Sequence, residues 1–146
     1  MLERLRQVAF LVKDLEEGKE LYRRHLGMET CHSEDLTNYG LLNAVLPAGA
    51  GTFIELLQPT SEESAAARYL ERRGEAPYML IFETSEYDRL IPNLKSMGVR
   101  LSEEPVTDDY RHAFIHPSSA NGAFLEIIEV TSGENPWPSA GPDWQT

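Results

Sequence analysis

The chain has 146 residues, a length that suits a single domain, and its 24 acidic against 13 basic residues give a formal net charge of −11. This charge disfavours nucleic acid as a partner, because most of the affinity of nucleic-acid binding comes from neutralising phosphates. The single cysteine, Cys31, cannot form an internal disulfide, and residues 1–6 lack the apolar run of a signal peptide or membrane helix. We therefore expect a cytoplasmic protein that binds neither nucleic acid nor a membrane.

The first half of the chain predicts a strand, a helix and three further strands. Residues 7–12 are mostly apolar and indicate a buried strand, and Asp14 begins a capping box ahead of a helix that ends at Gly27. The fourth strand, at 52–57, follows a turn at 47–51 that contains two glycines. This order of elements is β-α-β-β-β.

The second half repeats this order. A strand at 79–84 leads to Ser85, which we expect to cap a helix that has apolar residues at helical spacing and ends at Gly98. Strands near 99–103, 110–116 and 122–129 complete the set.

Equivalent landmarks of the two halves lie at a nearly constant offset, which indicates a duplicated supersecondary unit. The offset is 72 from Gln7 to Met79, 71 from Gly27 to Gly98 and 71 from Glu55 to Glu126. We expect an α+β domain over residues 1–130, with one module at about 5–59 and a second at about 77–130. A helix at 61–73, capped by Thr60, is expected to link them.

Residues 131–146 form a tail that is rich in proline, glycine and serine and therefore predicts no regular element. One interpretation is a loosely ordered chain end. The other is that Trp137 or Trp144 docks on a partner subunit or over the mouth of a cavity.

Side chains alternate along a strand, so each predicted strand has two faces. One face is apolar and is expected to pack on the helices; it carries Val8, Phe10, Val12, Ile54, Leu56, Leu80, Phe82, Leu125 and Ile127. The opposite face carries Gln7 and Glu55 in the first copy and Glu126 in the second, and these residues converge with Met79 if both copies curve around one cavity. A buried carboxylate needs a cation, a hydrogen-bond donor or a proton, whereas one at a wet sheet edge is simply solvated, and both interpretations stay open.

Seven short stretches carry a family resemblance that covers residues 5–130. They are VKDLEE (12–17), HLGM (25–28), IELLQP (54–59), YLERRGE (69–75), MGVRL (97–101), AFIHP (113–117) and FLEI (124–127). In this order and spacing they resemble the vicinal oxygen chelate superfamily of glyoxalases, bleomycin resistance proteins and dioxygenases, and within it the methylmalonyl-CoA epimerase branch. The resemblance implies two tandem βαβββ modules that form a curved mixed sheet around a central cavity, and a homodimer.

Members of this family bind one divalent metal ion through a ligand on each of four strands, commonly a histidine on the first strand of each module and a glutamate or glutamine on the last. The ion acts as a Lewis acid that stabilises an enolate-like intermediate. By this resemblance Glu55 and Glu126 match the last-strand ligands, whereas Gln7 and Met79 stand where the two histidines are expected.

Epimerase-like members also use a carboxylate as proton-transfer base just before the third strand. The matching position is Asn38, which is a candidate substrate contact and not a base, because an amide has no accessible pKa for that role. If the loop is displaced by a few residues, Glu34 or Asp35 would be the base.

Two catalytic schemes stay open for the paired glutamates. Gln7, Glu55 and Glu126 form an oxygen ligand set that suits Mg²⁺, Mn²⁺ or Ca²⁺ better than Zn²⁺, and Met79, here a substrate contact, would add almost nothing to it. Without a metal ion, facing Glu55 and Glu126 would repel each other, and one of them would hold a proton, so that the pair would serve as general acid and base. We expect metal binding to be weak or absent.

Other side chains are weaker candidates. Arg111 would bind a substrate carboxylate or would simply be solvated, and Phe53 and Phe124 would line a site for a flat ligand. His112 and His116 lie four residues apart on a predicted strand and would form a displaced metal pair, unless His116 only marks the end of that strand.

The sequence thus predicts a protein that binds or transforms a small oxygen-rich metabolite, such as an acyl-CoA or a 2-oxo acid derivative, by isomerase or lyase chemistry. A metal-free protein of the same fold that binds or sequesters a small molecule is the alternative. A dimeric structural domain with a vestigial site is a further alternative.

Overall fold

A computed structural model describes residues 1–142 and 144, and the chain divides into two compact units. The N-terminal unit comprises residues 8–78 and the chain end from residue 140; the C-terminal unit comprises residues 1–7 and 79–139. Strand β1 (Leu2–Leu11) therefore contributes its first part to one unit and its second part to the other. Within the described residues, no helix is both long enough and apolar enough to cross a membrane.

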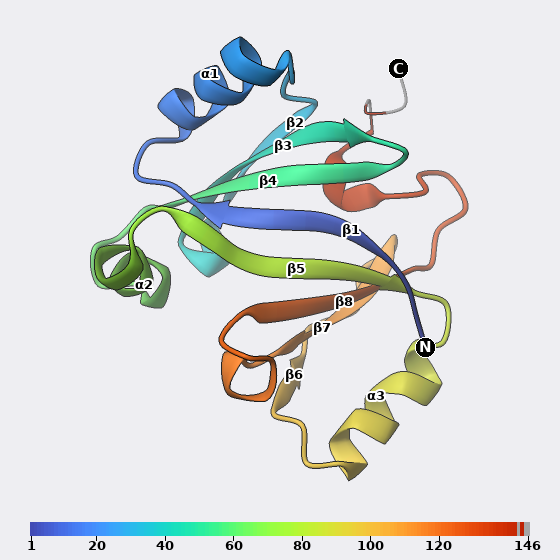
Figure 1. The fold of residues 1–146 in the computed structure, drawn as a ribbon. Helices are drawn as coiled ribbons and strands as arrows, with labels where there is room; N and C mark the ends of the chain where they lie inside the picture. Colours follow the sequence, from blue (N-terminus) through green and yellow to red (C-terminus); the bar gives the residue numbers. More distant parts are fainter. Residues whose placement is uncertain (143, 145–146) are drawn as a thin grey trace. The chain divides into compact units, whose positions relative to one another are not determined.

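In the N-terminal unit, α1 covers one face of the sheet (Figure 1). Its elements are α1 (Leu15–Leu26), β2 (His32–Leu36), β3 (Leu41–Gly49), β4 (Thr52–Pro59) and α2 (Ala65–Arg73), and the strand order is β2-β3-β4-β1. Phe10, Val12, Ile54 and Leu56 pack in one apolar cluster with Leu15 of α1. The alternation that placed these four strand residues on the helix side is confirmed.

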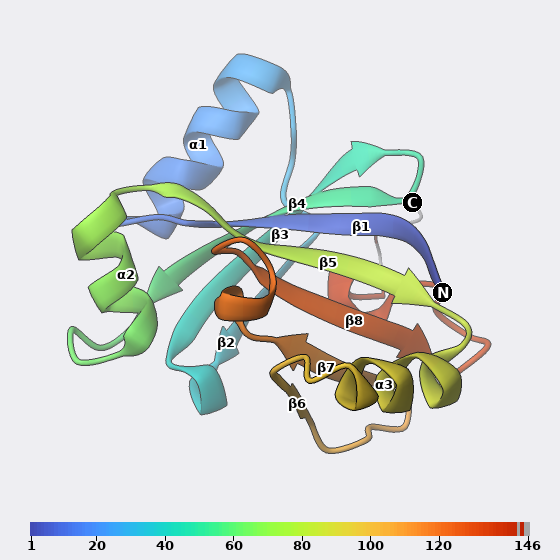
Figure 2. The same cartoon turned by 60° about the horizontal axis from the view of Figure 1, so that its bottom comes forward.

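In the C-terminal unit, α3 packs on a mixed sheet (Figure 2). Its elements are β5 (Ala76–Thr84, from residue 79 on), α3 (Tyr87–Ser96), β6 (Leu101–Glu103), β7 (Tyr110–Ile115) and β8 (Phe124–Val130), and the strand order is β1-β5-β8-β7-β6. Strands β5 and β8 are parallel, whereas β7 is antiparallel to both β6 and β8. Leu125 and Ile127 pack with Tyr87 and Ile91 of α3, again as the alternation predicted. The α+β fold class is confirmed.

Helix α2 begins later than the sequence pattern predicted. Its N-cap is Ser64 and not Thr60, because the Ser64 hydroxyl accepts a hydrogen bond from the Ala67 N–H at 3.0 Å. The four residues 61–64 stay outside the helix, which starts at Ala65. Serine is the stronger N-cap residue of the two, and the helix begins after it.

Helix α3 also lacks its predicted cap. It begins at Tyr87 after Glu86, and no side chain at the N-cap position binds its first turn. The hydroxyl of Thr84 accepts from the Glu86 N–H at 3.1 Å, and the carboxylate of Glu129 accepts from the Tyr87 N–H at 3.3 Å. Groups from the sheet thus satisfy donors that Ser85 was expected to satisfy.

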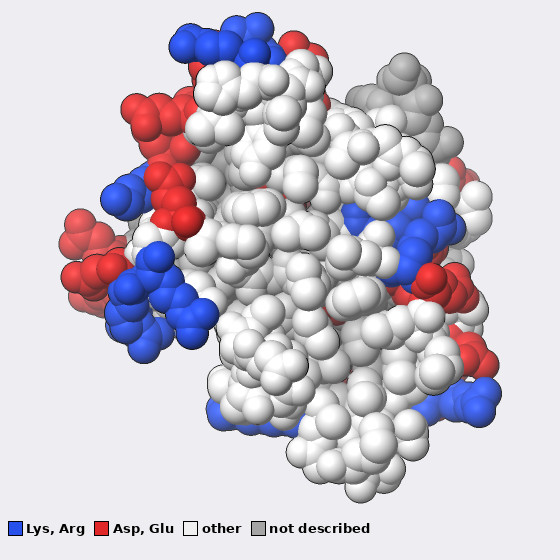
Figure 3. Space-filling view, viewed as in Figure 1, with Lys and Arg blue, Asp and Glu red and all other residues white. Residues whose placement is uncertain are grey.

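Charged side chains gather over the helices of the N-terminal unit. Figure 3 shows acidic and basic groups clustered over α1 and α2. On α1, Glu20 pairs with Arg23 at 2.7 Å and with Arg24 at 3.2 Å, and these hydrogen bonds lower the pKa of Glu20 to about 2. Exposed pairs of this kind contribute little to stability, and they mark a solvated helix face.

Candidate functional site

The C-terminal unit places a buried histidine beside a buried glutamate on the sheet face away from α3. In the β7–β8 pairing Phe114 lies opposite Glu126, which puts His112 on the same face. His112 Nδ1 and Glu126 Oε1 are 2.7 Å apart, and the two residues are only 7% and 9% exposed. The imidazole thus gives the carboxylate the polar partner that its burial requires.

Sequence spacing missed this pair, because it grouped His112 with His116. Strand β7 ends at Ile115, and His116 lies in the following turn, where its Nδ1 accepts from the Ser118 N–H at 3.1 Å. The two histidines therefore do not form a pair on one strand. The useful signal was the register of the β7–β8 hairpin, which places residues 112 and 126 on one face.

Gln7, the counterpart of an expected metal-binding histidine, is bound by the chain's own tail. The indole Nε1–H of Trp137 donates to the Gln7 side-chain oxygen, and Trp137 and Gln7 are 0% and 1% exposed. The guanidinium of Arg6 lies over the indole at 4.7 Å and donates to the Pro136 carbonyl at 2.8 Å. Arg6 is buried and pairs with Glu83 at 3.0 Å; burial lowers the pKa of Arg6, and Glu83 opposes this effect.

Met79 and Phe124 lie opposite each other in the parallel pair β5–β8. In the same register Ile81 lies opposite Glu126, so that Met79 and Phe124 share the sheet face of that carboxylate. Both residues are partly buried. The structure therefore brings two predicted substrate contacts to the face that carries the His112–Glu126 pair.

The N-terminal unit holds the other predicted glutamate, Glu55, which is 7% exposed. Its Oε1 accepts a hydrogen bond from Asn43 Nδ2 at 3.0 Å, and Asn43 Oδ1 in turn accepts from the Glu34 N–H at 2.8 Å. Glu55 lies opposite Val45 across β3 and β4, away from the cluster that packs on α1. An amide can donate a hydrogen bond to a carboxylate but cannot exchange a proton with it.

Asn38 and Phe53 occupy different parts of the N-terminal unit. Asn38 lies exposed in a 3₁₀ turn (Thr37–Tyr39), between β2 and β3. Phe53 is 2% exposed and meets Trp144 edge-on, with ring centroids 5.1 Å apart, at a cavity of about 370 Å³ beside the β3–β4 turn. The roles of both as substrate contacts stay predictions.

Arg111 lies on the helix side of its sheet. Its guanidinium binds both carboxylate oxygens of Asp88 at 2.8 and 2.9 Å, and its Nε donates to Glu129 at 2.6 Å. The hydrogen bonds from Arg111 lower the pKa of Asp88. The structure thus does not bring Arg111 to the face of Glu126, and it engages the guanidinium with carboxylates of the chain itself.

Glu55 and Glu126 belong to different units, so their meeting in one central cavity stays a prediction. The same holds for the joint ligand set that they would form with Gln7.

The residues within each unit do not fit a resident metal ion. No group of three or more His, Cys, Asp or Glu residues suited to a metal ion occurs in the described part of the chain. The side-chain oxygen of Gln7 accepts an indole N–H, the thioether of Met79 is a poor ligand for hard cations, and Glu126 already binds His112. The indole N–H of Trp137 points at the Gln7 oxygen, and a positively polarised N–H at this place disfavours a cation beside that oxygen.

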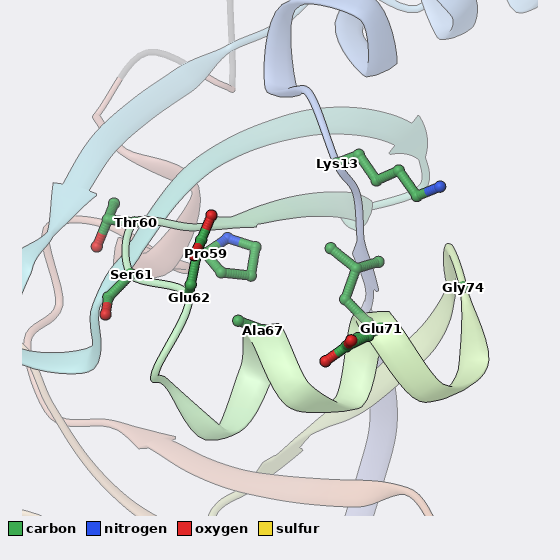
Figure 4. A pocket seen from close by; sticks show the side chains of 9 residues that line it. Lys13, Pro59, Thr60, Ser61, Glu62, Ala67, Glu71 and Gly74 are labelled. Carbon is green, nitrogen blue, oxygen red and sulfur yellow. The ribbon is translucent and has the colours of Figure 1, made fainter.

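A separate groove of about 500 Å³ lies in the N-terminal unit, beside α2 and the segments that follow β1 and β4 (Figure 4). It is lined by Lys13, Pro59, Thr60, Ser61, Glu62, Ala67, Leu70, Glu71 and Gly74. One cation and two carboxylates share this lining with apolar side chains, and it contains none of the residues predicted for chemistry.

Comparison with known proteins identifies the family. An ethylmalonyl-CoA/methylmalonyl-CoA epimerase of Cereibacter sphaeroides is 31% identical over 89% of this chain and 100% of its own length. The crystal structure of methylmalonyl-CoA epimerase from Mycobacterium tuberculosis superposes with a TM-score of 0.80 at 33% identity, covering 90% of each chain. A methylmalonyl-CoA epimerase in complex with methylmalonyl-CoA and NH4+ gives a TM-score of 0.80 at 28% identity, covering 93% of this chain and all of that one. The glyoxalase-like fold is thereby confirmed, and since the family profile matches residues 4–127, the chain belongs to the Glyoxalase/Bleomycin resistance protein/Dioxygenase superfamily.

Proposed function

We propose that this chain binds an acyl-CoA thioester related to methylmalonyl-CoA and moves a proton at the carbon next to the thioester carbonyl, with Glu126 and His112 as the proton-transfer pair. The observation that carries the proposal is the buried contact of 2.7 Å between these two side chains. The relatives that are methylmalonyl-CoA epimerases support the class of substrate.

The chemistry of the proposed step is an enolisation. Glu126 accepts the proton from the carbon beside the carbonyl, and the electrons of that C–H bond move onto the carbonyl oxygen. His112 shares the proton with Glu126, which keeps the buried carboxyl from carrying an isolated charge as it cycles between its two states. Return of a proton from the pair to the carbon restores the thioester.

A metal ion supplies Lewis-acid chemistry in many members of the superfamily, but no step of this proposal depends on one. Glu126 and His112 supply the proton transfer, since together they can both accept and donate a proton. The contrast between Glu126, which contacts an imidazole, and Glu55, which contacts an amide, is the reason for assigning the base to the C-terminal unit.

Deuterium exchange tests the proposal. The purified protein would be incubated with methylmalonyl-CoA in D2O, and incorporation of deuterium at the carbon beside the thioester would be followed by mass spectrometry against a protein-free sample. Glu126→Gln and His112→Gln should each lower the exchange rate by about a hundredfold or more. His25→Gln is the matched control, because this histidine is exposed in the last turn of α1. A deuterium exchange rate that neither Glu126→Gln nor His112→Gln changes would exclude the pair as the catalyst.

A binding protein without turnover is the second candidate, and the burial of Gln7 under Trp137 favours it. Saturable binding of methylmalonyl-CoA in calorimetry, with no exchange above the protein-free rate, would select this function. The homodimer stays a prediction that light scattering of the purified protein checks.

A further inference from the structure

The tail of the C-terminal unit is tied down at two places. We name residues 131–139 the strap. At its start, the N–H groups of Thr131 and Ser132 donate to the carbonyl of Asp109 at 2.8 and 3.2 Å. Near its end, the buried indole of Trp137 binds Gln7 and lies under Arg6.

Between these two attachments the strap is largely exposed and has no strand or α-helix. Gly133 and Glu134 are exposed, and the only regular element is a single 3₁₀ turn (Pro138–Ala140) that begins after Trp137. A segment with one deeply buried side chain and few other buried contacts belongs to the least stable part of a fold, so it opens locally before the sheet does. Trp137 is therefore the latch of the strap.

The latch covers a residue of the candidate site. Gln7 stands on β1, next to β5, which carries Met79 on the face of Glu126. With Trp137 in place Gln7 is 1% exposed, and its side-chain oxygen already accepts the indole N–H. A ligand that reaches Gln7 must take the place of the indole.

We propose that the strap is an autoinhibitory lid, which closes the Gln7 end of the site with Trp137 and which a bound acyl-CoA displaces. This inference rests on the proposed function for the identity of the ligand. Because only the open form binds, the apparent dissociation constant equals the intrinsic constant divided by the open fraction. Removing the latch must therefore strengthen binding.

Two variants of the latch test the lid, with calorimetric titration of methylmalonyl-CoA as the measurement. Trp137→Ala removes the whole anchor and should lower the dissociation constant about tenfold or more. Trp137→Phe keeps a ring in the core but loses the N–H donated to Gln7, and should lower the constant about fivefold. Glu134→Gln, a change of an exposed side chain within the strap itself, is the matched control and should leave the constant unchanged.

Fluorescence of the Trp144→Phe variant follows the latch directly, because Trp137 is then the only tryptophan. A buried indole emits at shorter wavelength than a solvated one, so saturating methylmalonyl-CoA should shift the emission to longer wavelength. This readout does not require a variant at Trp137 itself and stands if Trp137→Ala fails to fold.

The outcomes separate the lid from the proposed function. Binding that is equal in wild type and both Trp137 variants, or saturation without a change in Trp137 emission, overturns the lid and leaves the proposed function standing. Absence of binding by every form, including the Trp137 variants, overturns both. Tighter binding without deuterium exchange supports the lid on a binding protein.

Discussion

The two units carry the same glutamate at matched positions of their last strands, and they surround it differently. Glu55 is 7% exposed and accepts a hydrogen bond from Asn43, whereas Glu126 is 9% exposed and contacts His112. Both partners satisfy a buried carboxylate, but only an imidazole can also take or supply a proton. Burial alone therefore does not distinguish the two carboxylates. The side chain that each one contacts on the neighbouring strand does distinguish them.

The largest expected difference is in catalysis. Glu126→Gln should lower deuterium exchange of methylmalonyl-CoA by about a hundredfold or more, because it removes the base, while Glu55→Gln should change the rate by only about a fewfold. Mass spectrometry of the labelled thioester measures both variants. If both variants lost the exchange rate equally, the two glutamates would act together, as one interpretation of the sequence predicted. The two units would then not differ in their catalytic role.

The next effect is on stability. His112→Leu leaves Glu126 without the imidazole and should cost about 3 to 5 kcal/mol of unfolding free energy, whereas Asn43→Leu removes an uncharged amide partner of Glu55 and should cost about 1 to 3 kcal/mol. Urea unfolding followed by circular dichroism gives both values. The double variant His112→Leu with Glu126→Gln should recover part of the first loss, because the charge that needed a partner is gone. A smaller loss for His112→Leu than for Asn43→Leu would show that the histidine is not a true partner of the carboxylate.

A smaller effect is expected in the pH dependence of stability, where a tyrosine on α3 is compared with one on α1. Burial raises the pKa of Tyr87 to about 12, with Glu103 adding to the effect, from the value of 10.0 for a free phenol. Because the folded state holds the neutral phenol, this contribution is fully present below pH 10 and is lost as the pH rises through 12, by about 1 to 2 kcal/mol. Unfolding free energies measured between pH 9 and 12 should fall less steeply for Tyr87→Phe. Tyr22→Phe in α1 is the control, because burial also raises the pKa of Tyr22. If Tyr22→Phe changed the pH dependence of the unfolding free energy more than Tyr87→Phe does, the prediction for Tyr87 would be wrong.

The duplicated order of elements and the two faces of each strand could be predicted because both depend on local periodicity. Ile54 and Leu56 meet α1, and Leu125 and Ile127 meet α3, since alternation along a strand is fixed by backbone geometry. The starts of α2 and α3 were not predicted correctly. In α3 the first N–H groups are satisfied from the sheet by Glu129, a contact that no local spacing encodes.

The site was predicted only in part, for the same reason. Strand parity placed Gln7, Glu55 and Glu126 on the face away from the helices but left open whether the glutamates are buried, and their partners depend on pairing between segments far apart in sequence. His112 meets Glu126 only once the register of β7 and β8 is known, and the contact of Trp137 with Gln7 joins residues from opposite ends of the chain. A tail rich in proline and glycine gives no periodic signal of such a contact.

The smallest expected effect comes from removing metal ions. Dialysis against EDTA should leave the deuterium exchange rate within about twofold, because Gln7 accepts an indole N–H and Glu126 contacts His112, so that neither offers a free ligand oxygen pair to a cation. The control is the same protein after readdition of Mn²⁺ or Mg²⁺. A rate that collapses on chelation and returns with the ion would make Glu126 a ligand instead of a base. In that case His112 would serve to orient Glu126 as a ligand and not to exchange a proton with it.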